Sequence, residues 1–382
     1  MPSMDLIREL AVRRPGTPVL SVYVRTDPRD PANTAAVPGW LVELRNALRE
    51  AGREVDGAEP RGVRLALREL CERVERDVLA LEPAGRGRGL AWFLTADGVL
   101  DHRFTLQLPP ASTLACWDDL PFVSPLADVA DRGRAAGLVL VSAEAVRLLH
   151  WQDGRVAEPE RSLYEIDRGE WRDYDAYVGH PGRSPAGMHV AEFDQRVEEW
   201  RQRFLRTTAA AVAAQVAGLG WHRILVAGER RVTGAFVDQL PGPMSAQVVT
   251  IVEANLIWEE HAAVADRLEG ALDRARVQEA RVLVEQAIQG AFAGGAAAIG
   301  WPEVTNSLAY HRVRHLIVGA GAAPDPGLID PRTQAALGWP SGRMLVERAV
   351  EQAVISAAEV TMLPADTPEL VRAGGAAALL RY

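Results

Sequence analysis

Apolar residues recur along the chain in two spacings that alternate from segment to segment. Continuous apolar and β-branched runs, typical of buried strands, occur at 18–25, 137–141, 145–151, 222–229 and 313–321. Apolar residues three or four apart, typical of helices, occur at 3–14, 38–51, 61–82 and 257–293. Strand-like composition on both sides of Asp97 and Gly98 predicts a hairpin. The alternation predicts an α/β protein with an α+β first domain.

The order of these elements predicts three domains. The chain has 382 residues, and one domain usually takes roughly 100–200 residues. We expect an N-terminal α+β domain over 1–134, a middle domain over 135–272 and a C-terminal α/β sandwich over 273–382.

A polar stretch interrupts the expected middle domain over residues 167–189. It is rich in glycine and proline and too long for an ordinary connection, which is typical of a functional loop. We expect the helix that follows to begin near Ala191. Its apolar face is predicted to pack in the core through Phe193, Val197, Trp200, Phe204, Thr208 and Ala211.

Composition and charge narrow the possible functions. All 42 basic residues are arginine, so chemistry that needs a lysine is excluded, and the net charge is −9. Binding to RNA would therefore depend on local arginine patches. The two cysteines, Cys71 and Cys116, exclude a disulfide scaffold and a thiolate zinc site. We expect no cofactor or metal, and, because no signal peptide or membrane span is recognisable, a cytoplasmic protein without a membrane partner.

Three stretches resemble one protein family, and they follow one another along the chain in the order found in that family. The stretch "EVTMLPADTPELVRAGGAAALLRY" carries Gly374-Gly375 and ends in "LRY", and it is similar to the end of archaeal and eukaryotic class-1 peptide chain release factors and Pelota. "LVLVSAEAVRLLHWQDGRV" resembles the hairpin that opens the middle domain of that family. The helix with Phe193 and Arg196 resembles the helix after the family's Gly-Gly-Gln loop. "LSVYVRTDPRDP" is similar to the bacterial branch, which includes Balon-like ribosome hibernation factors.

The resemblance implies a fold and partners. The middle domain would be ribonuclease-H-like, and the C-terminal domain would be the α-β-α sandwich of kink-turn-binding ribosomal proteins. The implied partners are the ribosome, entered at the A site with contacts to ribosomal RNA, and a translational GTPase such as elongation factor Tu. The C-terminal domain would dock that GTPase or RNA.

The resemblance also identifies a candidate tip without its catalytic group. In the hydrolytic members, Gly-Gly-Gln ends five residues before the phenylalanine of the helix, and the glutamine positions the attacking water. Here Ala186, Gly187 and Met188 stand at that place. A thioether accepts hydrogen bonds weakly and donates none, so we expect no catalytic residue and a lost hydrolytic activity. The family's decoding motifs are not recognisable either. The expected ribosome- or RNA-contact loop is Arg183, Ser184, Ala186, Gly187, Met188 and His189, beside a basic surface of Arg196, Arg203, Arg230 and Arg231.

Other chemistry remains open on the residues alone. His180 and His189 flank the polar stretch, and an acidic run (Asp167, Glu170, Asp173 and Asp175) could act in acid–base catalysis, although solvated loop residues are the simpler interpretation. Gly228 after an apolar run suggests a phosphate loop, but no Gly-rich phosphate motif follows.

Three functions are therefore carried forward. The first is a ribosome-binding factor for hibernation, dormancy or rescue. The second is a peptidyl-tRNA hydrolase or tRNA-acting nuclease using His189 and the acidic run. The third is a stress-response binding protein that no longer acts in translation, which the net charge of −9 favours because a ribosome ligand gains from a basic surface.

Overall fold

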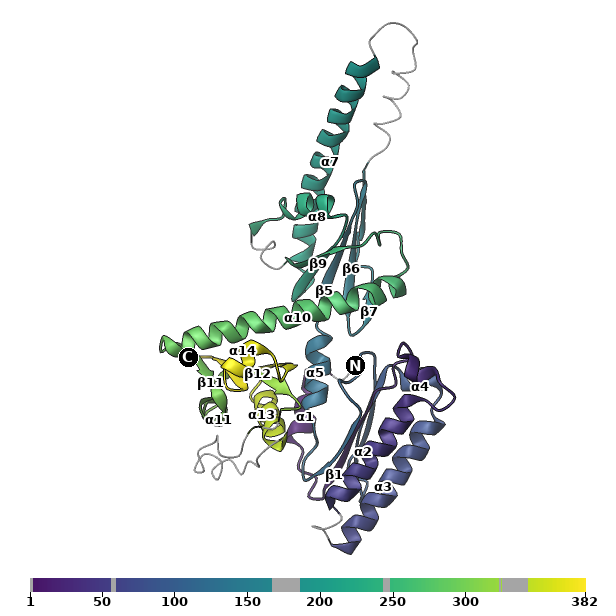
Figure 1. Ribbon diagram of the computed structural model, residues 1–382, viewed down its shortest axis with the longest axis vertical. Coiled ribbons are helices and arrows are strands. Elements are labelled where there is room, and N and C mark those ends of the chain that lie inside the picture. The colour runs from purple at the N-terminus through teal and green to yellow at the C-terminus, as the bar shows by residue number, and fades with distance from the viewer. Residues whose placement is uncertain (1–2, 56–59, 167–185, 243–247, 323, 325–342) are drawn as a thin grey trace. The chain divides into compact units, whose positions relative to one another are not determined.

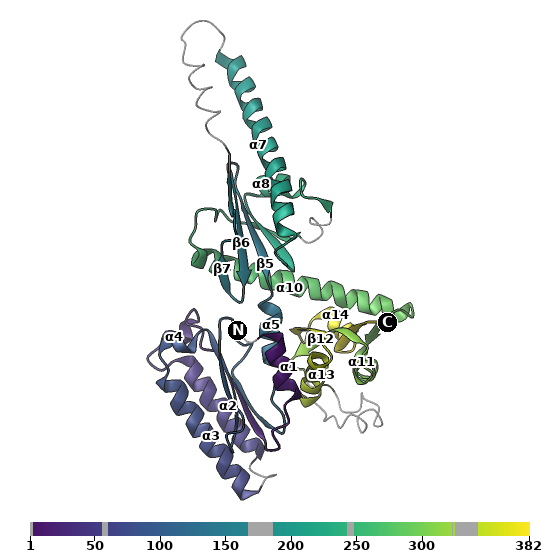
Figure 2. The same ribbon diagram turned by 180° about the vertical axis from the view of Figure 1, so that it is seen from behind.

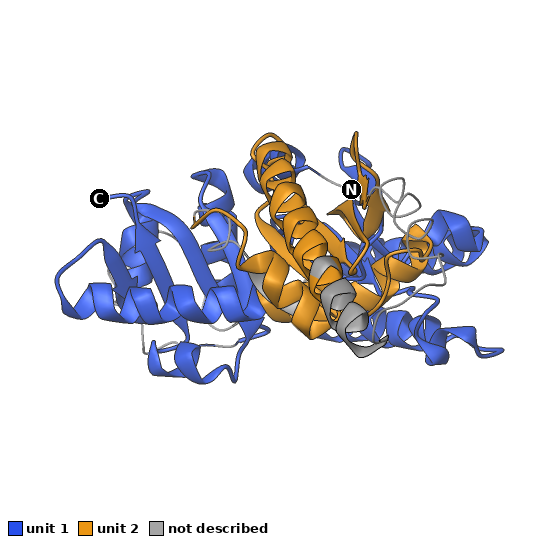
Figure 3. Ribbon diagram, turned by 90° about the horizontal axis from the view of Figure 1, so that it is seen from above, with its two compact units in different colours: residues 1–133, 276–382 blue, residues 134–275 orange. Residues whose placement is uncertain are grey.

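The computed structural model describes residues 3–55, 60–166, 186–242, 248–322, 324 and 343–382. The chain divides into two compact units (Figure 3). Unit 1 contains residues 1–133 and 276–382, and unit 2 contains residues 134–275. The predicted α/β class is confirmed, since both units combine sheets with covering helices.

The first part of unit 1 is an antiparallel sheet with two long helices on one face (Figure 1). Its strands run in the order β3-β2-β1-β4, and the predicted hairpin at Asp97 and Gly98 is confirmed as the β2–β3 pair. Leucines and valines of α2 and α3 pack on β1 and β2 in one core. The elements are β1 (Val19–Val24), β2 (Gly89–Thr95), β3 (Asp101–Leu106), β4 (Leu114–Asp118), α2 (Gly39–Val55), α3 (Arg61–Ala80), η1 (Pro31–Thr34) and α4 (Pro83–Arg86).

The last part of unit 1 is a sheet between two layers of helices, as predicted for an α-β-α sandwich. The strand order is β11-β14-β12-β13. The C-terminal half of α10 packs on one face, where Ala280 and Val284 meet Ile317 and Leu363. Helices α11 and α13 contact strands of the same sheet and each other. The elements are α10 (His261–Phe292), β11 (Ala297–Ile299), α11 (Gly300–Ala309), β12 (Val313–Ala320), α13 (Arg343–Ile355), β13 (Glu359–Pro364), α14 (Pro368–Arg372) and β14 (Ala376–Leu380).

Two short helices join the first and last parts of unit 1. Helix α1 (Met4–Val12) and helix α5 (Ser124–Arg132) both contact α13. Ile7 and Leu10 of α1 and Leu126 of α5 are fully or almost fully buried. The first and last parts therefore share a core, while the three-domain division stays a prediction about the organisation of the chain.

Unit 2 is a six-stranded mixed sheet with α7 and α8 packed against it. Strands β5, β6 and β7 form an antiparallel meander, and β9 and β10 run parallel to β5 on its other side, in the order β10-β9-β5-β6-β7. This order is the one expected for a ribonuclease-H-like domain. The elements are β5 (Ala136–Val141), β6 (Ala145–Gln152), β7 (Arg155–Ala157), β8 (Leu163–Glu165), α7 (Ala186–Val216), β9 (Arg223–Gly228), α8 (Arg230–Val237) and β10 (Val248–Glu253).

Helix α7 corrects two sequence predictions. It begins at Ala186 and not near Ala191, so the loop assignment of Ala186, Gly187, Met188 and His189 is wrong. Alanine, methionine and glutamate favour helix, and the single glycine costs only about 1 kcal/mol relative to alanine. The buried face only overlaps the predicted one. Of the predicted positions, Thr208 is buried while Val197, Trp200, Phe204 and Ala211 are half-buried and the Phe193 side chain lies outside the described residues. The other buried positions are Leu205, Ala209, Val212 and Val216.

Candidate functional site

Helix α7 carries the candidate tip of unit 2. Its C-terminal half is anchored, since Leu205, Ala209 and Val212 pack in the core with residues of the sheet. Its N-terminal half projects beyond the end of the sheet (Figures 1 and 2). The described side chains there, at 195 and 197–204, are exposed or half-buried. The helix therefore holds its first turn away from the body of the unit.

The triplet Ala186-Gly187-Met188 lies in that first turn. Its backbone is helical, as is that of His189. Arg183, Ser184, His180 and the acidic run of 167–175 lie outside the residues that the structure describes. The first N–H groups of a helix lack intrahelical acceptors and can bind an anion. The turn can thus offer main-chain donors, but it carries no side-chain amide to orient water.

The four arginines predicted as a basic surface lie on α7 and α8, two helices that contact each other. Arg203 is exposed on α7. Arg230 donates from Nε to Glu253 Oε1 at 2.6 Å, and Arg231 lies 3.7 Å from Glu198. The hydrogen bond from Arg230 lowers the pKa of Glu253. These carboxylates offset the charge of Arg230 and Arg231, whereas the side chain of Arg196 lies outside the described residues.

Gly228 has a structural role that the phosphate-loop interpretation did not include. A Cβ at this position would lie 2.1 Å from the carbonyl oxygen of Val141 on the neighbouring strand. Gly137 is similar, because a Cβ there would meet the Trp221 ring at 2.0 Å. The Trp221 indole in turn donates to His150 Nδ1 at 2.7 Å. Close packing within the sheet therefore requires these glycines.

Arg147 was missed by sequence reasoning. Its guanidinium donates to the carbonyl oxygens of Ile257 and Glu259, at 3.1 and 2.8 Å, and to Glu158 at 2.6 Å. These bonds tie the segment after β10 to strand β6. The side chain of Trp258 in that segment is 66% exposed. Two of the acceptors are main-chain oxygens, which leave no signal in the sequence.

Within the described residues, no group of three or more His, Cys, Asp or Glu side chains is placed to hold a metal ion. His315 is buried, and its ring lies 3.0 Å from Thr361 Oγ1 and 3.7 Å from Glu359. This histidine packs inside the C-terminal sandwich and serves the fold. No helix among the described residues has the length and apolarity of a membrane span.

In a comparison with known protein families, the middle of the chain matches one family model. Residues 121–273 match the family model described as bacterial archaeo-eukaryotic release factor family 10. This range contains nearly all of unit 2, including α7 and the triplet in its first turn. This segment of the chain is thus similar to the bacterial branch of the archaeo-eukaryotic release factors. No curated protein matched the sequence.

Solved structures similar to this chain include two proteins titled translation termination or termination-like factors and one titled Pelota. An archaeal translation termination factor, aRF1, is 16% identical, covers 95% of this chain and 92% of its own, and has a TM-score of 0.25. Pelota of Archaeoglobus fulgidus is also 16% identical, with coverage of 74% and 75% and a TM-score of 0.36. Dom34 of S. cerevisiae, titled a translation termination-like factor interacting with Hbs1, is 9% identical, with coverage of 76% and 74% and a TM-score of 0.37.

Proposed function

We propose that the chain binds the ribosomal A site as a release-factor-like protein without hydrolysing peptidyl-tRNA, and that it acts in hibernation, dormancy or rescue. One observation carries the proposal. The segment that matches a release factor family contains the projecting helix α7, and its first turn holds Ala186-Gly187-Met188, the triplet that the resemblance puts in place of Gly-Gly-Gln.

The chemistry of this turn argues against hydrolysis. Attack of water on the ester of peptidyl-tRNA needs a positioned water and stabilisation of the developing oxyanion. Met188 has no amide to position the water. The triplet is helical, so its backbone also differs from the glycine-rich loop that the resemblance gives to the hydrolytic members.

Binding would use the projecting helix and a second protein. Arg203 on α7 is exposed and can contact RNA phosphate. The sandwich formed by the last part of unit 1 is proposed to dock a translational GTPase, for which elongation factor Tu is the first candidate. The salt dependence of RNA binding grows with the number of phosphates that are neutralised, so a surface of few uncompensated arginines on a chain of net charge −9 implies binding that weakens only gradually with salt.

Co-sedimentation with purified 70S ribosomes, with and without elongation factor Tu and GTP, tests the binding proposal. We expect the protein in the ribosome pellet, with more pelleted when the GTPase is present. Arg203→Glu should reduce pelleting severalfold. Arg155→Glu is the matched control, because Arg155 is exposed on β7, away from the α7 tip, and should leave pelleting unchanged. Recovery of the parent protein only in the supernatant, with ribosomes in excess, would contradict the proposal.

A release assay on ribosomes that carry peptidyl-tRNA tests the loss of hydrolysis. The parent protein should free no nascent chain above background. The double variant Ala186→Gly/Met188→Gln restores the letters of the motif, but we expect it to remain inactive because the helical backbone is retained. Release by the parent at the rate of a true terminator would overturn the proposal. Loss of that release in His189→Ala would then favour the hydrolase or nuclease alternative.

A further inference from the structure

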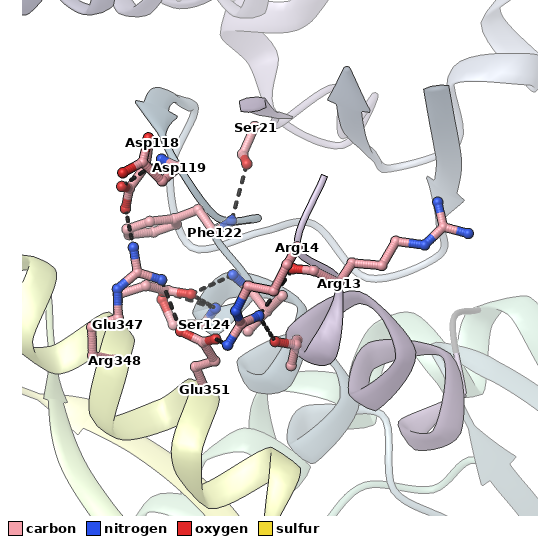
Figure 4. A network of polar contacts seen from close by, with 12 residues as sticks. Arg13, Arg14, Ser21, Asp118, Asp119, Phe122, Ser124, Glu347, Arg348 and Glu351 are labelled. Atoms are coloured by element: carbon pink, nitrogen blue, oxygen red, sulfur yellow. Dashed lines mark hydrogen bonds and ion pairs between the residues drawn. The ribbon is translucent and has the colours of Figure 1, made fainter. Parts of the chain in front are cut away.

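Helix α13 places a carboxylate inside unit 1, where its first and last parts meet. Glu347 is 1% exposed. Its oxygens accept hydrogen bonds from the main-chain N–H of Val123, at 2.5 Å, and of Ser124, at 3.1 Å (Figure 4). Ser124 is the first residue of α5. The two donors come from a segment more than 200 positions away along the chain.

Burial and hydrogen bonding act on Glu347 in opposite directions. Removal from water disfavours the ionised carboxylate, whereas the Val123 and Ser124 donors favour it. Burial is the larger effect and raises the pKa of Glu347 to about 7. The Glu347 carboxyl group therefore ionises near neutral pH, whereas an exposed glutamate ionises in the acidic range.

The nearest cation only partly compensates the Glu347 charge. Arg348 is engaged with two other carboxylates, since it donates to Asp118 and, at 2.8 Å, to Glu351 (Figure 4). Glu351 also accepts from Arg14 at 2.8 Å. The neighbouring cationic groups are thus already committed to their own partners.

Further groups around Glu347 are acidic, neutral, or arginines that are already paired with a carboxylate. Asp128 of α5 and Glu50 and Glu54 of α2 line the same cavity of about 260 Å³ as Glu347. Asp128 is paired with Arg132 at 2.9 Å, and burial raises its pKa. On β1, the Tyr23 hydroxyl donates to Phe122 O at 2.6 Å, and its pKa is raised by burial and by Glu347. The Asp131–Arg276 pair, 3.3 Å apart, lies at the other end of α5.

We propose that the contact of residues 118–124 and α5 with α13, here called the joint, is a pH-responsive cover over one face of the first sheet of unit 1. The joint is closed most tightly when Glu347 is protonated, and ionisation lets it open. In the open state, Glu347 reaches water and the face of the sheet beneath Phe122 is uncovered. This inference is independent of ribosome binding.

The direction follows from linkage. The closed joint binds the Glu347 proton more tightly than the open joint does, because the pKa is about 7 when buried and near that of an exposed glutamate when open. The stabilisation is complete below the pKa of the open state, about 4.3. It is lost as the pH rises through about 7. The joint should therefore open more often as the pH rises from acidic to mildly alkaline values.

Cys116 reports on this face of the sheet. It is 3% exposed on β4 and pairs in register with Ser21 of β1, whose hydroxyl accepts from the Phe122 N–H at 3.0 Å. Cys71 is the internal control, since it lies half-buried on α3 against the opposite face of the sheet. Global unfolding of unit 1 would expose both thiols, whereas opening of the joint would expose Cys116 alone.

The test measures thiol alkylation of the full chain between pH 5.5 and 8. The rate at each cysteine is divided by the rate in the denatured protein at the same pH, which removes the pH dependence of the thiol itself. We expect the protection of Cys116 to fall by roughly tenfold or more across this range, and that of Cys71 to change little. In Glu347→Gln the fall should disappear, and it should persist in Glu285→Gln, a control on α10 whose half-buried carboxylate pairs with Arg372 of α14.

Two results would overturn the proposal. One is protection of Cys116 that does not depend on pH in the parent protein, or that changes in parallel with that of Cys71. The other is a Glu347→Gln variant that retains the pH dependence of the parent. If Glu347→Gln does not fold, the comparison of Cys116 with Cys71 in the parent chain still decides the outcome.

Discussion

The joint of unit 1 and the surface formed by α7 and α8 in unit 2 both pair arginines with carboxylates, but the pairs are buried in the joint and exposed in unit 2. In the joint, the Arg348 and Glu351 side chains are only 11% and 5% exposed. In unit 2, the Arg230 and Arg231 side chains are 81% and 82% exposed, although both also lie near carboxylates. A buried charge must keep its partner, whereas an exposed pair contributes little to stability. Charges in the joint should therefore affect folding, and those in unit 2 should affect binding.

The largest expected effect is that of Arg348→Ala. The change leaves Asp118 and Glu351 partly or wholly buried without the guanidinium between them. Breaking a buried pair by removing one partner costs about 3 kcal/mol or more. Urea unfolding, monitored by hydrogen exchange of the β12 and β14 amides, should show that the free energy of unfolding of unit 1 falls by that amount. Arg231→Ala is the control and should leave unfolding unchanged; equal effects of the two substitutions would remove the distinction between the regions.

A smaller loss is expected from Gly228→Ala, at the end of β9 next to helix α8. The new methyl group would meet Val141 O at 2.1 Å, so the parallel strands must separate. Overpacking of this kind costs about 1–3 kcal/mol. Gly234→Ala is the matched control, because α8 leaves open space there, and it should stabilise the helix by about 0.5–1 kcal/mol. Thermal unfolding of both variants checks the opposite signs.

Much of the scaffold could be predicted from the sequence, because strong local patterns encode it. The predicted β-branched runs correspond to β1, β5, β9 and β12, and Asp97 and Gly98 lie in the turn of the β2–β3 hairpin. The start of α7 was misplaced because glycine and proline upstream suggested a longer loop. Strand β11 has only three residues, too few for a periodic signal, whereas β10 has six, as β1 does, and its β-branched run was missed.

The contacts around the candidate site and the joint could not be predicted. The resemblance placed Met188 in the triplet, but no local pattern indicates that Arg230 meets Glu253 or that Arg231 meets Glu198. The partners of Glu347 are main-chain N–H groups, which any residue other than proline could supply. Such contacts arise from tertiary packing and leave no trace in residue type or spacing.

A modest effect is expected from removing the partly buried hydrogen bond between Trp221 and His150 in unit 2. Trp221→Phe removes the indole N–H that donates to His150 Nδ1 at 2.7 Å, while retaining an aromatic ring over Gly137. One such bond contributes about 1 kcal/mol. Thermal unfolding should show a loss of this size in unit 2 and none in unit 1. A loss as large as that of Arg348→Ala would mean that neutral contacts in unit 2 matter as much as the charged joint of unit 1.

The smallest effect on stability, and the most informative about function, is expected from Glu253→Gln. The Arg230–Glu253 pair is exposed, so its loss should leave the unfolding midpoint unchanged. The substitution also removes the carboxylate that compensates Arg230, which leaves an additional uncompensated positive charge on the surface of unit 2. If this surface contacts ribosomal RNA, pelleting with 70S ribosomes should increase at moderate salt, and the increase should vanish at high salt because screening removes it. Unchanged pelleting at every salt concentration would place Arg230 outside the binding surface and leave α7, with Arg203, as the part of unit 2 that binds.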